Sequence, residues 1–71
     1  MMKKVTADRV YSAIARSLRD FGYAGVTPQM VQEAHEAIKA GKQRNEMPYG
    51  IVGQFAFSQI NEAIEERLLS G

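Results

Sequence analysis

The chain has 71 residues, of which 45% are hydrophobic and 24% charged, and its formal net charge is +1. This composition excludes a disordered or fibrous protein, and the absence of cysteine excludes disulfides, thiolate metal sites and a thiol nucleophile. One small domain is expected. A chain of this length buries only about 60% of its unfolded surface, so association with another chain is a common way of completing the core.

The sequence predicts no membrane segment and no secretory leader. No apolar run approaches the roughly 20 residues that a membrane-spanning helix needs. Lys3 and Lys4 are followed within a few residues by Asp8, so no apolar leader core forms. Together with the lack of cysteine, this pattern indicates a cytoplasmic protein.

The first predicted helix covers residues 7–21. Thr6 can cap its start, and Gly22 supplies the left-handed stop. Apolar side chains recur at spacings of four and three residues: Val10, Ile14, Leu18 and Phe21. At about 100° per residue, the opposite face is basic and carries Arg9, Arg16 and Arg19.

The second predicted helix covers residues 28–40 and has the clearest start signal. Thr27 can cap it, Pro28 suits the first helical position, and Val26 can pack on Val31 as a hydrophobic staple. Gly41 closes it. The inward stripe is Met30, Val31, Ala34, Ala37 and Ile38. The solvated face is Gln32, Glu33, Glu36 and Lys39.

A polar loop, Gly41 to Pro48, precedes the third predicted helix. Asn45 is the expected cap, with Pro48 tolerated in the first turn, and the helix is expected to run to Leu69. Its main stripe is Gly53, Phe57, Ile60, Ile64 and Leu68, bordered by Val52, Ala56 and Ala63. Ile51 and Phe55 point to the opposite side.

The first half of this last helix is therefore apolar on two faces. Either the first two helices cover both faces within one chain, or a second chain covers one of them. Small residues three apart, Gly50, Gly53 and Ala56, favour the close approach of another helix. We interpret the region as a protein interface, with a homodimer or an unidentified protein as partner. Its residues are Gly50, Ile51, Gly53, Gln54, Phe55 and Ser58.

No catalytic, cofactor, metal or small-molecule site is predicted. His35 is the single histidine and lies at the edge of the second helix's apolar stripe, where a structural role is expected. Glu33 and Glu36 face solvent, and nothing indicates the burial that would bring a carboxyl pKa into a catalytic range. The sequence favours a protein that is not an enzyme.

A DNA-binding regulator is the alternative function. The segment 14–27 resembles the first helix and turn of tetracycline-repressor-type DNA-binding domains, in which a hydrophobic helix ends in Gly-Tyr and leads to a Thr-initiated helix. The long second helix and the loop after it depart from that pattern. The pI of about 8.1 is low for a nucleic-acid binder. Candidate contacts to phosphate are Arg9, Arg16, Arg19, Lys42 and Arg44.

Opposite charges gather at the two ends of the chain. Residues 1–20 hold five basic side chains against two acidic ones, and residues 50–71 hold three glutamates against one arginine. Pairing of these ends within one molecule is the simpler expectation, and pairing between molecules is the other. The sequence thus predicts an all-α, three-helix domain spanning residues 1–71, with the longest helix C-terminal and central, completed by dimerisation.

Overall fold

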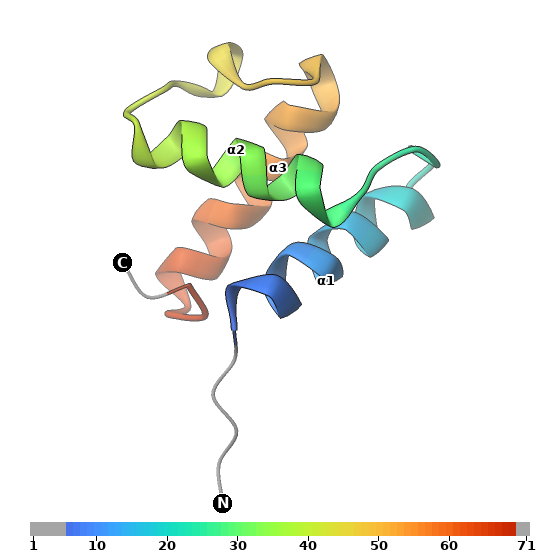
Figure 1. Cartoon of the computed structure of the whole chain (residues 1–71), viewed down its shortest axis with the longest axis horizontal. Coiled ribbons are helices and arrows are strands. Elements are labelled where there is room, and N and C mark those ends of the chain that lie inside the picture. The colour runs from blue at the N-terminus through green and yellow to red at the C-terminus, as the bar shows by residue number, and fades with distance from the viewer. Residues whose placement is uncertain (1–5, 70–71) are drawn as a thin grey trace, which may run out of the picture.

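The computed structural model describes residues 6–69, which form three α-helices and one short 3₁₀ turn. The helices are α1 (Ala7–Asp20), α2 (Pro28–Lys39) and α3 (Gly50–Glu65), and the turn is η1 (Arg44–Glu46). The predicted all-α, three-helix fold is confirmed, and α3 is the longest helix with 16 residues. It contacts α1, α2 and η1, and α2 crosses in front of it in Figure 1. None of the described helices is long and apolar enough to cross a membrane.

Local signals set the ends of α1 and α2, as predicted. The hydroxyls of Thr6 and Thr27 each accept a hydrogen bond at 3.4 Å from the backbone N–H three residues further on. Pro28 occupies the start of α2. Gly22 and Gly41 follow the two helices with φ values of 121° and 89°, in the left-handed region that glycine adopts without strain.

The predicted start of the third helix at Asn45 is wrong. Residues 44–46 form η1 instead, and the chain then becomes extended at Met47. The residue before a proline is disfavoured in the helical region, so Pro48 breaks any helix begun earlier. α3 begins only after Tyr49, whose φ of 67° is left-handed. The Tyr49 hydroxyl donates a 2.9 Å hydrogen bond to Glu33 on α2, which ties this reversal to the rest of the fold.

The predicted end of the third helix at Leu69 is also wrong. The helix stops at Glu65, and Arg67 adopts a left-handed φ of 64°. The N–H groups of Leu68 and Leu69 both donate to the carbonyl of Ala63, so the chain folds back on the last turn. Leu69 is thereby buried.

The buried face of α3 is rotated from the predicted stripe. Its buried residues are Gly53, Ala56, Ile60 and Ala63. Ile64 and Leu68, which were expected in the core, are 37% and 42% exposed. Because the helix has apolar residues around much of its circumference, periodicity alone does not fix the face that packs. The alanines allow α1 and α2 to approach more closely than the larger side chains would.

The core lies where the three helices meet. Val10, Ile14 and Leu18 of α1 are buried as predicted, together with Val26 and Val31, the two residues of the expected staple. Phe21 is an exception, because it caps α1 instead of continuing it, and its side chain is 74% exposed. The buried stripe of α1 therefore ends at Leu18, and the Phe21 ring remains in solvent.

Candidate interaction surface

A groove in two parts lies between α1 and α3. Its larger part has a volume of about 420 Å³, and its smaller part about 130 Å³. Gln59 lines both parts, so the two hollows adjoin at this residue of α3. From α1 the groove is lined by Arg9, Val10, Ala13, Ile14, Ser17 and Leu18. We call this feature the α1–α3 groove.

One end of the α1–α3 groove is aromatic and apolar. The rings of Phe21 and Phe55 meet edge to face with centroids 5.8 Å apart, and Tyr23 lies at the same distance from Phe55. Ile51 stands four residues before Phe55, on the same side of α3, and is 56% exposed. Phe21, Ile51 and Phe55 form what we call the aromatic end.

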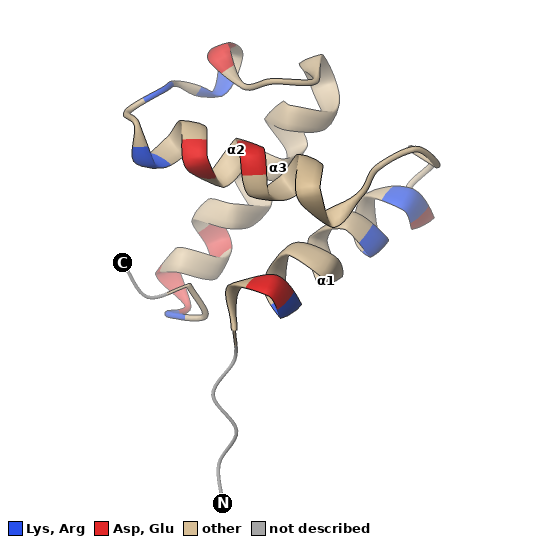
Figure 2. Cartoon of the chain, in the orientation of Figure 1, with Lys and Arg blue, Asp and Glu red and all other residues tan. Residues whose placement is uncertain are grey.

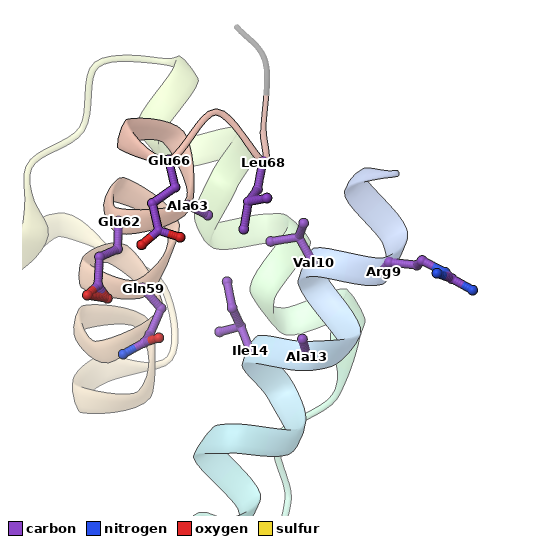
Figure 3. A pocket seen from close by; sticks show the side chains of 9 residues that line it. All are labelled: Arg9, Val10, Ala13, Ile14, Gln59, Glu62, Ala63, Glu66 and Leu68. Carbon is purple, nitrogen blue, oxygen red and sulfur yellow. The ribbon is translucent and has the colours of Figure 1, made fainter. Parts of the chain in front are cut away.

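The other end of the groove is charged. Figure 3 shows Glu62 and Glu66 on the wall formed by α3, and Arg9 on α1 with its side chain pointing away from them. Val10 and Leu68 lie between these walls and give the groove an apolar floor. Among residues 6–69 the one ion pair joins Lys39 and Glu36 at 3.6 Å, within α2. Among the described residues, no ion pair joins the arginines of α1 to Glu62, Glu65 or Glu66, and Lys3 and Lys4 lie outside the described residues.

The predicted interface residues fall into two groups. Gly50, Ile51 and Ser58 are exposed, whereas Gln54 and Phe55 are half-buried. Phe55 packs against the core, so part of its side chain is covered by its own chain, as the intramolecular alternative expected. Ile51 remains open to solvent and keeps the surface apolar.

Gly53 has a different role from the predicted one. It is buried, and a Cβ atom at this position would lie 1.8 Å from the carbonyl oxygen of Pro48 and 2.9 Å from Cβ of Met47. The backbone that lies close to Gly53 belongs to the connection between η1 and α3 of the same chain, and not to another helix. Gly53 therefore serves the fold and does not present a surface to a partner.

The predicted basic residues do not gather on one surface. Figure 2 shows the basic residues of α1 on one side of the view and those of the connection between α2 and α3 on the opposite side. The guanidinium of Arg19 donates a 2.9 Å hydrogen bond to the carbonyl of Val26, which anchors the α1–α2 connection. Arg9 and Arg16 are exposed on α1. These positions form no continuous track for a phosphate backbone.

His35 joins α2 to α1 through a side-chain hydrogen bond. Its Nδ1 lies 2.5 Å from the Tyr11 hydroxyl, which donates to the neutral imidazole, and the two rings meet edge to face. Burial, followed by the charge of Lys39, lowers the pKa of His35. Burial, followed by the charges of Glu36 and Asp8, raises the pKa of Tyr11. Both shifts favour the neutral pair in the folded chain.

We expect this pair to make stability depend on pH below neutrality. The pKa of His35 is lowered from 6.5 in the folded state, so the unfolded state binds more protons between the two values. The free energy of unfolding should therefore be constant above pH about 7 and fall as the pH drops below about 6.5 towards the folded pKa. Urea unfolding at pH 7.5 and 5.5 measures the loss. His35→Gln, which keeps an acceptor but does not titrate, should lose less stability between these conditions, and an equal loss would contradict the assignment.

The α1–α3 groove was not predicted from the sequence. Its signal is a set of small side chains, Ala13 and Ser17 on α1 and Ala63 on α3, which leave open a space that larger side chains would fill. No group of three or more potential metal-ligating side chains gathers in residues 6–69. No protein-family description, curated protein or solved structure matches this chain. The surface itself is thus the basis for a proposed function.

Proposed function

We propose that this chain is a non-enzymatic protein–protein interaction module that associates with a second copy of itself through the aromatic end of the α1–α3 groove. The observation that carries the proposal is the exposure of Phe21 and Ile51, which are 74% and 56% exposed beside the half-buried Phe55. Burial of a Phe or Ile side chain contributes about 1.5–3 kcal/mol relative to leaving it in water. A twofold contact would bury each of these side chains twice.

The chemistry of the groove supports binding of a protein surface. Its floor is apolar, and Glu62 and Glu66 stand exposed at the rim, where water keeps them solvated. An enzyme site needs convergent polar groups in a sheltered cavity. An apolar floor with a polar rim is the arrangement typical of protein–protein interfaces.

Ile51→Glu tests the proposal with little risk to the fold, because most of the Ile51 side chain is already in solvent. We expect light scattering after size exclusion to give a dimer mass for the wild type and a monomer mass for the variant. A charge placed in an apolar contact is costly to bury, and it occurs twice across a twofold axis.

Gln32→Glu is the matched control, since Gln32 is exposed on α2 and the substitution adds the same charge. It should dimerise as the wild type does. A wild type that stays monomeric at millimolar concentration would overturn the proposed self-association. Equal dimer masses for wild type and Ile51→Glu would overturn the proposed surface.

A further inference from the structure

The two ends of the α1–α3 groove differ in chemistry, and the helices that form it run in opposite directions. Arg9 near the start of α1 and Glu66 at the end of α3 line the same hollow. Phe21 after α1 and Phe55 in the first half of α3 line the other. Each end of the groove therefore receives a contribution from both helices. At the charged end, α1 contributes Arg9, at the outer edge of the hollow, and α3 contributes Glu62 and Glu66 (Figure 3).

We propose that a second copy of the chain occupies this groove along its whole length, related by a twofold axis parallel to the groove, so that α1 of each copy lies on α3 of the other. The inference rests on the proposed self-association and specifies its geometry. In this geometry the charged end is part of the contact surface, whereas contact between the aromatic ends alone would not require it.

The pattern of side chains selects this axis. A twofold axis parallel to the groove keeps each end of one copy opposite the same end of its partner and exchanges the two walls. The aromatic ends then face each other. Arg9 of each copy faces Glu62 and Glu66 of the other. An axis across the groove would instead place the aromatic end of one copy on the carboxylates of the other and leave charges facing apolar side chains.

The charges at this end are available to a partner. Glu62 and Glu66 are exposed, and Arg9 makes no ion pair among the described residues. Arg16, two turns further along α1, is also exposed and extends the basic edge. Complementary charges across an interface select partner and register more than they add affinity. The opposite charges of α1 and α3 therefore specify that α1 of one copy meets α3 of the other.

A charge exchange between two variants tests the geometry. The first variant combines Arg9→Glu and Arg16→Glu, which makes both walls acidic. The second combines Glu62→Arg and Glu66→Arg, which makes both walls basic. All four positions are exposed, so both variants should fold, and circular dichroism checks that they do. The native mass of each variant and of their equimolar mixture is measured at low ionic strength by sedimentation.

Each variant alone should dimerise about 30-fold more weakly than the wild type, because both seams of its dimer now bring like charges together. The mixture should form a heterodimer, since both of its seams regain opposite charges. Substitution of the same four positions by Gln should give intermediate homodimers and no preference for mixing. The effect should shrink at 1 M salt, where charges separated by more than about 3 Å are screened.

Two results would overturn the inferred geometry while leaving the proposed function intact. Either variant dimerising as tightly as the wild type would show that the charged end lies outside the contact. Variants that stay monomeric when mixed would show that the two walls do not face each other. A wild type that stays monomeric would, in contrast, overturn both the proposed self-association and this geometry. That result would also be obtained if the groove binds a helix of another protein.

Discussion

Gly53→Ala is expected to destabilise the folded chain by about 2 kcal/mol, although alanine is the better helix former. The added Cβ would lie 1.8 Å from the Pro48 carbonyl oxygen, a backbone atom, and 2.9 Å from Cβ of Met47. Neither neighbour is the free end of a flexible side chain, so the connection must move away from α3. The strain of that movement should exceed the gain in helix propensity, which is about 1 kcal/mol. Urea unfolding followed by circular dichroism measures the difference.

Gly25→Ala is the matched control. Its Cβ would meet no atom within 4 Å, and its backbone is outside the left-handed region. This variant should be as stable as the wild type or more stable by about 0.5 kcal/mol, through the lower entropy of its unfolded chain. A Gly53→Ala protein more stable than the wild type would contradict the packing described for the start of α3.

Phe55→Ala is expected to cost about 2 kcal/mol of folding free energy. The Phe55 ring packs on the core and meets both Phe21 and Tyr23 at 5.8 Å between centroids. Removing it abolishes both aromatic contacts and leaves space beside the core. Because it is half-buried, the loss should be smaller than for a fully buried phenylalanine, for which about 3–5 kcal/mol is usual.

Phe55→Leu separates the two contributions. It keeps most of the apolar volume but removes the edge-to-face contacts, so it should cost about 1 kcal/mol. Unfolding is measured at one low protein concentration, because dimer dissociation would otherwise add a concentration-dependent term. An alanine variant within about 0.5 kcal/mol of the wild type would show that Phe55 belongs to the surface alone. This dual role is why Ile51 is the better position for testing association.

The parts of the fold set by neighbouring residues could be predicted from the sequence. Thr27 followed by Pro28 fixes the start of α2, and Gly22 and Gly41 end the first two helices, because each acts on backbone groups within one turn. The inward stripe of α1 was predicted as far as Leu18, since a helix with one apolar face has one way to pack.

The start of α3 depends on contacts that are distant in sequence. Tyr49 adopts a left-handed conformation while its hydroxyl is bonded to Glu33, sixteen residues earlier. The Pro48 carbonyl packs directly against Gly53, because glycine has no Cβ atom. The sequence predicted a close contact at Gly53 but did not predict that Pro48 makes it, because a small residue indicates that another group comes close and does not identify that group.

The candidate surface was predicted in part. Ile51 was expected on the face of the third helix opposite its main stripe, and it is exposed there. The contribution of α1 was missed, because Phe21 meets Phe55 only through the packing of α1 on α3. Helix periodicity describes one helix at a time and carries no information on the angle between two.

The most direct measurement is the concentration dependence of backbone amide chemical shifts in the ¹⁵N-labelled wild type. Between about 20 μM and 1 mM, we predict shift changes along one continuous surface that includes Phe21, Ile51, Gln59 and Glu62, with Gln32 on the outer face of α2 unaffected. Micromolar to millimolar dissociation constants fall within this range. Shifts that stay constant throughout, or that change on the outer face of α2 instead, would contradict association through the α1–α3 groove.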